Sequence, residues 1–107
     1  MTLKLAPDVE AIVTLVPPEE GGRTTMAYSG YRPVHAVLPD YLTSGIHEYL
    51  DGDSLEPGGT ARAHIKFITP DSYPNSLSVG QVIRVQEGGR LIGHAEITKI
   101  FNDVLRA

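Results

Sequence analysis

Glycine and proline divide this chain into short segments and leave little room for long regular elements. Eleven glycines and eight prolines occur among its 107 residues, and they recur along the whole sequence. Because both residue types interrupt helices and strands, a chain divided in this way favours many short elements joined by turns. Between the interruptions, apolar residues alternate with polar ones, as they do in half-buried β-strands. We therefore predict an all-β protein.

About six extended segments are expected along the chain. Residues 60–69 alternate most clearly, and residues 8–16 form another clear strand that ends at Pro17-Pro18. The remaining expected segments are residues 31–38, 45–50, 81–87 and 90–101. Exposed strand edges promote aggregation, so these strands are better closed into a barrel than left as an open sheet. The predicted fold class is a six-stranded antiparallel closed β-barrel.

The predicted barrel is a single domain over residues 1–107, with residues 1–7 and 102–107 as terminal extensions. The C-terminal extension is expected to form a short turn. Residues 40–59 are the least regular part of the chain, because turn-forming residues interrupt them repeatedly. The initiating Met1 favours a complete gene product.

The last two expected strands form the clearest hairpin. Gly88-Gly89 is its two-residue loop, and both glycines are expected to take the positive φ that a type I′ turn requires. In the second strand, Gly93 and Ala95 share one face with Ile97. Side chains as small as these suit a tightly curved or crowded site.

Composition and charge argue against several functional classes. A net charge of −4 opposes strong, non-specific nucleic-acid binding, which needs a surplus of lysine and arginine, although a local basic face stays open. The absence of cysteine excludes disulfides and thiolate-based zinc sites. No apolar run has the length of a signal peptide or a membrane span, so we expect a soluble cytoplasmic protein without membrane contact.

Three glycine–arginine motifs carry the most specific signal in the sequence. They are Gly21-Gly22-Arg23, Gly30-Tyr31-Arg32-Pro33 and Glu87-Gly88-Gly89-Arg90, with six residues between the first and the second. Their order and spacing on this strand pattern resemble the C-terminal (third) β-barrel domain of the elongation factor Tu family. The resemblance covers roughly residues 8–100. It implies a stand-alone six-stranded barrel that lacks the family's GTPase domain.

The resemblance also implies partners and contact residues. In the full factor this barrel contacts the T-stem backbone of aminoacyl-tRNA and meets the nucleotide-exchange factor, so aminoacyl-tRNA, the elongation factor and its exchange factor are the implied partners. Carried over by position, the tRNA-facing candidates are Arg23 and the Glu87-Gly88 turn, with Arg32 and Arg90 as further candidates. The planar guanidinium of arginine suits phosphate because it can bond two oxygens. No phosphate-binding Gly-x-x-x-x-Gly-Lys-Ser/Thr loop occurs, so this chain alone is expected to bind no GTP.

A structural role competes with a binding role for each arginine. Arg23 lies in a long loop, where the two roles are equally open. Arg32 and Arg90 follow turns, where positioning the backbone is the commoner role. The polar Gln that usually follows the family's second motif is Val34 here, so part of the implied RNA surface has changed.

Metal binding and catalysis are the less favoured interpretations. His35, His64 and His94 fall in expected strands that could bring two of them together, but metal sites usually need three or four ligands in fixed geometry. Hydrogen-bonded or solvated histidines are therefore expected. No Ser-His-Asp arrangement or carboxylate pair stands out. We expect no enzyme, no cofactor and no metal.

Two functions are carried forward from the sequence. The leading one is a non-catalytic binding module, related to the third domain of elongation factor Tu, that binds an RNA stem or a translation-factor partner. The alternative is an interaction or assembly protein that kept the barrel fold and lost the translation role, with a homo-oligomer as one form. An isolated barrel exposes surfaces that other domains cover in the full factor, so those surfaces must be polar or buried in an oligomer.

Overall fold

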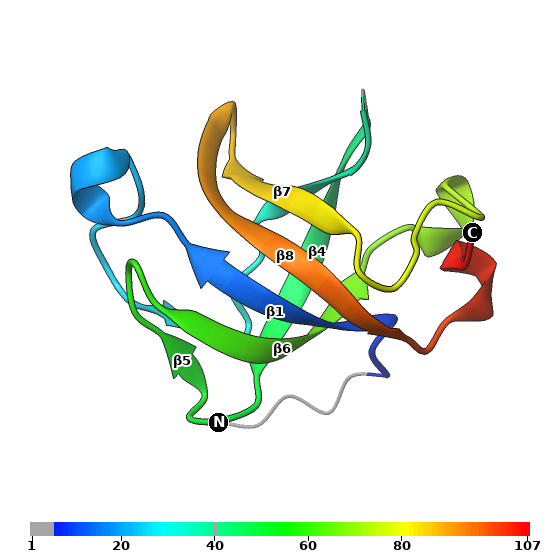
Figure 1. Cartoon of the computed structure of the whole chain (residues 1–107), viewed down its shortest axis with the longest axis horizontal. Coiled ribbons are helices and arrows are strands. Elements are labelled where there is room, and N and C mark those ends of the chain that lie inside the picture. Colours follow the sequence, from blue (N-terminus) through cyan, green and yellow to red (C-terminus); the bar gives the residue numbers. More distant parts are fainter. Residues whose placement is uncertain (1–5, 40) are drawn as a thin grey trace.

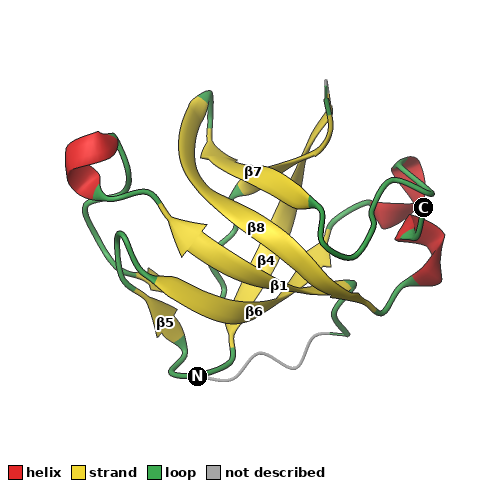
Figure 2. Ribbon diagram, in the orientation of Figure 1, coloured by secondary structure: helices red, strands yellow, loops and turns green. Residues whose placement is uncertain are grey.

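Six strands close into an antiparallel barrel, as the sequence predicts. The computed structural model describes residues 6–39 and 41–107, and within them the barrel order is β1-β6-β4-β3-β7-β8 (Figure 1). Every neighbouring pair in this order is antiparallel. The barrel strands are β1 (Val9–Leu15), β3 (Val34–Leu38), β4 (Tyr41–Tyr49), β6 (Thr60–Phe67), β7 (Val82–Glu87) and β8 (Arg90–Ile100). Figure 2 shows strands and loops with only short helical turns at the margins of the barrel.

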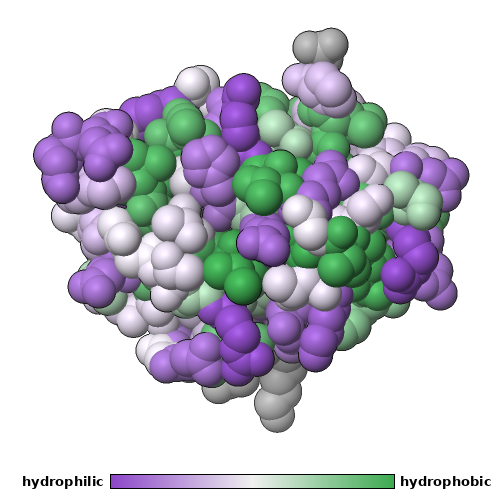
Figure 3. Space-filling model, in the orientation of Figure 1, coloured by the Kyte–Doolittle hydropathy of each residue, from purple (hydrophilic) through white to green (hydrophobic). Residues whose placement is uncertain are grey.

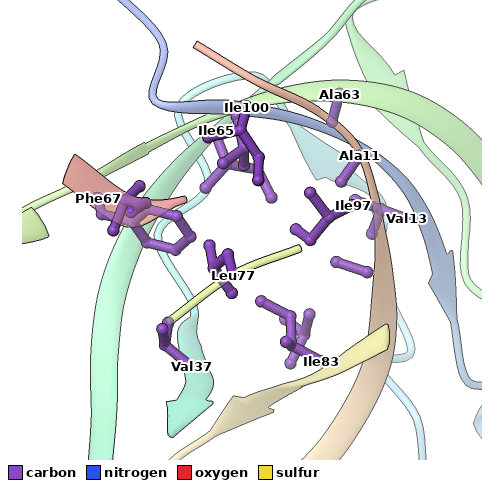
Figure 4. Packing of buried hydrophobic residues seen from close by; sticks show 14 of the residues in the cluster. Ala11, Val13, Val37, Ala63, Ile65, Phe67, Leu77, Ile83, Ile97 and Ile100 are labelled. Atoms are coloured by element: carbon purple, nitrogen blue, oxygen red, sulfur yellow. The ribbon is translucent and has the colours of Figure 1, made fainter. Parts of the chain in front are cut away.

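Alternation along each strand builds the core. On β1, Val9 and Val13 are fully buried, while Ile12 and Thr14 between the inward positions face solvent. The same alternation on β6 buries Ile65 and Phe67, and Figure 4 shows side chains from these strands meeting inside the barrel. Side chains on a strand point alternately to its two faces, so the period-two pattern of the sequence marks the inward face.

β4 is longer than the sequence pattern indicates. It spans Tyr41–Tyr49, whereas the sequence predicts a strand only over residues 45–50. The inward positions of β4 are all buried, and most are polar: Thr43, Gly45, His47 and Tyr49. Because polar groups occupy the inward face, the apolar–polar alternation that reveals other strands is missing here.

A small second sheet forms where the sequence predicts loops. β2 (Ala27–Tyr28) pairs with β5 (Ser54–Leu55), and both Ala27 and Leu55 are buried. Strands of two residues are too short to show the apolar–polar alternation by which a strand is predicted from sequence. Two further segments form single turns of 3₁₀ helix, η1 (Pro18–Glu20) and η2 (Pro70–Ser72).

The β7–β8 hairpin forms as predicted, but its turn differs. Glu87 pairs with Arg90, so Gly88-Gly89 is the two-residue loop. Only Gly88 has a positive φ, of 59°, so the expectation for Gly89 is wrong. A positive φ at the first loop position alone matches a type II′ turn, which follows the strand twist as well as type I′ does. Further along β8, the predicted crowding at Gly93 is confirmed, because a Cβ there would lie 2.6 Å from the Thr14 carbonyl oxygen.

The C-terminal segment packs onto the end of the barrel. The predicted short turn is η3 (Asp103–Leu105), whose first backbone N–H groups are capped when the Asn102 side chain accepts from Val104 N. Leu105 is fully buried, and its carbonyl accepts from Leu77 N at 2.8 Å. Residues 102–107, expected to be an extension, thus contribute to the core.

Part of the predicted N-terminal extension, residues 1–5, lies outside the described residues, as does Asp40. Within the described ranges, no helix is both long enough and apolar enough to cross a bilayer.

Candidate functional site

A charged cluster forms where two of the glycine–arginine motifs meet the β7–β8 hairpin. We define the Gly-Arg cluster as Arg23, Tyr31, Glu87 and Arg90. Glu87 is the last residue of β7, and its Oε2 accepts hydrogen bonds from Arg23 and from the Tyr31 hydroxyl. Its other oxygen accepts from Arg90 at 3.1 Å. One carboxylate therefore holds together donors that lie far apart in the sequence.

Arg23 is fixed from several sides. Its guanidinium donates to the Thr25 hydroxyl at 3.1 Å and to the Met26 carbonyl at 3.2 Å, in addition to Glu87. It also lies 4.5 Å from the centroid of the Tyr31 ring, within the range of a cation–π interaction. The Arg23 side chain is only 19% exposed. These contacts hold the loop that follows η1 against the hairpin.

The hydrogen bonds and charges within the cluster shift the pKa values of its members. Burial acts to raise the pKa of Glu87, but hydrogen bonds from Tyr31, Arg23 and Arg90 outweigh it and hold that pKa below its ordinary value. Burial, together with the Glu87 carboxylate, raises the pKa of Tyr31. Burial acts to lower the pKa of Arg23, and the bonds to Glu87 and Tyr31 more than offset it. At neutral pH the cluster holds a carboxylate, a neutral phenol and two cations.

The structure brings three of the predicted site residues together and leaves one outside. Arg23, Glu87 and Arg90 share the cluster, and Gly88 forms the turn between the last two. Arg90 keeps 56% of its side chain exposed, so it presents a cation to solvent. Arg32 is also exposed, and in the described part of the chain no hydrogen bond or ion pair holds it. Sequence reasoning missed Tyr31 as a cluster member, although it lies inside the second motif.

A second polar cluster lies inside the barrel. We define the buried histidine network as His35, His47, Tyr49, Thr43 and Tyr73. The Nε2 atoms of the two fully buried histidines are 2.8 Å apart. Nδ1 of His35 lies 3.2 Å from the Thr43 carbonyl, and Nδ1 of His47 lies 3.0 Å from the Tyr49 hydroxyl. The Thr43 hydroxyl in turn lies 3.2 Å from that of Tyr73.

The position of each proton in this network follows from the Thr43 carbonyl, which can only accept a hydrogen bond. A carbonyl oxygen only accepts, so His35 carries its proton on Nδ1 and donates to Thr43. A neutral His35 then accepts at Nε2 from His47, and His47 accepts at Nδ1 from the Tyr49 hydroxyl. This arrangement satisfies every ring nitrogen while both histidines stay neutral.

Burial keeps the histidine network uncharged. It lowers the pKa of His35 to about 4, although the hydrogen bond to Thr43 acts in the opposite direction. Burial, together with the neighbouring His35, lowers the pKa of His47 well below its ordinary value. Protonation of His35 would also place its Nε2–H against the Nε2–H of His47. In the described ranges no contact joins any two of His35, His64 and His94, the three histidines that the sequence placed in expected strands. His35 meets His47 instead.

The two outer histidines have ordinary surroundings. Nε2 of His64 lies 3.2 Å from a carboxylate oxygen of Glu10, and His94 is exposed on β8. Among residues 6–39 and 41–107, no group of three or more His, Asp or Glu side chains is placed to hold a metal ion. A scan against models of known protein families finds none that matches the chain. The relationship to the third domain of elongation factor Tu therefore stays a prediction.

Proposed function

We propose that this chain is a non-catalytic binding module, related to the third domain of elongation factor Tu, whose Gly-Arg cluster contacts the sugar-phosphate backbone of an RNA stem. The motif order supports the relationship, and the closed barrel is the fold that it implies. Aminoacyl-tRNA is the proposed RNA, and a cytoplasmic location goes with that role. The chain alone binds no GTP in this proposal, because its sequence contains no Gly-x-x-x-x-Gly-Lys-Ser/Thr loop.

The observation that carries the proposal is the way Glu87 presents Arg90. The carboxylate is held by Arg23 and Tyr31 and in turn holds the Arg90 guanidinium at 3.1 Å, beside a two-residue turn. A cation fixed in this way loses little side-chain entropy when it meets a phosphate. Gly88 and Gly89 carry no side chains, and no atom lies within 4 Å of where a Cβ would be, so a nucleic-acid backbone can come close.

Charge sets the expected strength of this contact. Arg32, which has no ion-pair partner in the part of the chain that the structure describes, adds a cation next to Tyr31 in the sequence. The chain as a whole nevertheless carries a net charge of −4. The long-range field therefore opposes a phosphate backbone, and local contacts must supply the attraction. Binding should be weak and should fall steeply with salt.

Fluorescence anisotropy with labelled aminoacyl-tRNA tests the proposal. Arg90→Ala should weaken binding by about tenfold or more and reduce the slope of log K against log salt by about one. Arg62→Ala is the matched control, because Arg62 is similarly exposed (54%) and also pairs with one acid, Asp51. Arg62 lies on β6, away from the β7–β8 turn (Figure 1). Equal losses for the two variants, or no binding by the parent chain, would refute the RNA contact.

Exposed apolar side chains favour a second candidate, an interaction or assembly protein. Val79, Val82 and Ile68 are each more than half exposed. Figure 3 shows apolar residues scattered among polar ones over the visible face. The elongation factor, its exchange factor or a second copy of the chain is then the partner. Light scattering separates the candidates: a monomer that binds RNA supports the first, and a stable oligomer indifferent to RNA supports the second.

A further inference from the structure

The junction between β3 and β7 is the least complete pairing in the barrel. It consists of only two residue pairs, Val34 with Gln86 and His35 with Val85. On its other side, β7 pairs with β8 along its whole length. Beyond His35 the strands β3 and β7 separate, and a hollow of about 270 Å³ lies between residues 36–39 and 81–84. We call this hollow the β3–β7 groove.

The groove has an apolar floor and apolar rims. Val37 and Ile83 form the floor, and each is only 3% exposed. Figure 4 shows their side chains on one side of the core, with Leu77 next to them. Leu38 and Val82 stand at the rims and are 37% and 57% exposed. Apolar side chains that enter the groove would cover both rims and gain burial that the isolated chain does not provide.

Within residues 6–39 and 41–107, one wall of the groove is a strand edge without a partner. Ile97 N on β8 donates to Gln81 O at 2.9 Å, which places the carbonyl of Gln81 on the β8 side. Backbone groups alternate between the two sides of a strand, so those of the next residue, Val82, point away from β8 and towards the groove. The pairing of β7 with β3 has ended at that level. An extended peptide can continue the sheet from such an edge.

Arg84 supplies the charge preference. It lines the groove and is exposed, and its guanidinium donates to the neutral Gln86 side chain at 3.0 Å. In the described ranges no carboxylate forms an ion pair with Arg84. A carboxylate on the bound segment would therefore complete it.

We propose that the β3–β7 groove binds an extended peptide segment of a partner protein, with apolar side chains over Val37 and Ile83 and an acidic side chain on Arg84. The segment adds to the edge of β7 at Val82. None of the groove residues belongs to the Gly-Arg cluster, so peptide binding and RNA binding can succeed or fail independently.

Amide spectra of the whole ¹⁵N-labelled chain, titrated with synthetic peptides, test this proposal. The probe is a heptapeptide of alternating valine and threonine with a central aspartate. We expect saturable shifts confined to residues 36–39 and 81–86. A peptide with lysine in place of aspartate should bind about tenfold more weakly. A peptide with N-methylated backbone amides should not bind, because it cannot form the strand bonds.

Two chain variants provide the matched comparison. Arg84→Gln should remove the preference for aspartate over lysine, while Arg62→Gln, on the outer face of β6, should leave it unchanged. Shifts elsewhere, equal binding of the aspartate and lysine peptides, or no shift at millimolar peptide would overturn the proposal. Concentration-dependent shifts of the groove amides without peptide would also overturn it, because the occupant would then be a second copy of the chain.

Discussion

The Nε2 atoms of His35 and His47 lie 2.8 Å apart inside the barrel, and neither ring is exposed to solvent. Two histidines at this distance share one proton between their Nε2 atoms, and burial lowers the pKa of both rings, so the pair is neutral at pH 7. The network extends through Tyr49 on one side and Thr43 on the other. The core of this barrel therefore depends on the protonation state of its interior.

Stability should fall as pH drops through the histidine range. Unfolded histidines have a pKa of about 6.5, whereas that of folded His35 is lowered to about 4. The unfolded chain then binds more protons below pH 6.5, so the stabilisation is complete above that pH and is lost on the way towards pH 4. His35 alone should make the free energy of urea unfolding about 2 kcal/mol lower at pH 5 than at pH 7.5, and the lowered pKa of His47 should add to that fall.

The choice of pH 5 separates the histidines from the carboxylates. Because the pKa of Glu87 is lowered by folding, its ionised carboxylate stabilises the folded chain above the pKa that Glu87 has when unfolded. This stabilisation is lost only at a more acidic pH, as the carboxylate becomes protonated. A His94→Gln variant is the control, since His94 is exposed and its replacement should leave the fall between pH 7.5 and 5 unchanged. Equal unfolding free energies of the parent chain at the two pH values would contradict a neutral buried pair.

Tyr49→Phe should destabilise the barrel without changing its shape. The substitution removes the hydroxyl that donates to Nδ1 of His47 and leaves a buried acceptor without a partner. Such a loss costs about 1–3 kcal/mol, which chemical denaturation measures directly. Tyr28→Phe removes a hydroxyl from a side chain that is 64% exposed and should be nearly neutral. If both variants lose the same amount, the network contributes nothing specific.

Arg23→Ala should act on stability more than on binding. Arg23 is mostly buried and contacts Glu87, Tyr31 and the loop carbonyl of Met26, so its loss should cost about 1–3 kcal/mol. Arg62→Ala removes a surface ion pair of similar composition and should cost less than about 1 kcal/mol. Thermal unfolding compares the two. An Arg23→Ala chain as stable as the parent would show that the cluster does not hold the loop.

Gly93→Ala should disturb the packing of β8 on β1. A Cβ at Gly93 would come within 2.6 Å of the Thr14 carbonyl oxygen, a backbone atom that cannot move without shifting the strand. Overpacking of this kind costs about 1–3 kcal/mol. Gly89→Ala is the matched control, because no atom lies within 4 Å of a Cβ there and its φ is not positive. Denaturation midpoints that fall equally for both variants would contradict the crowding at Gly93.

Strand alternation predicted most of the barrel. Segments with an apolar inward face, such as β1 and β6, were placed within a few residues of their observed bounds. β4 was underestimated because residues 41–44 reverse the expected pattern: the polar Thr43 faces inward and the apolar Leu42 is half exposed. The small β2–β5 sheet was missed because a strand of two residues has no period to detect.

Long-range polar contacts were the part of the candidate site that sequence could not supply. The motifs indicated Arg23, Glu87 and Arg90, but the sequence does not determine which of its carboxylates bonds the two arginines. Tyr31 enters the cluster because β3 brings its motif next to β7, so that it bonds Glu87, 56 residues further along the chain. The His35–His47 contact likewise depends on the register of β3 against β4, which alternation alone does not determine.

The most direct test of the proposed RNA contact is an amide spectrum of the ¹⁵N-labelled chain during titration with aminoacyl-tRNA at low salt. We predict shifts or broadening centred on Glu87, Gly88, Gly89 and Arg90, with Arg32 affected and the β3–β7 groove unaffected. These changes should reverse on addition of salt, because phosphate contacts release counterions. Changes centred elsewhere on the barrel, or an unchanged spectrum at saturating tRNA, would contradict the assignment of the Gly-Arg cluster as an RNA-binding surface.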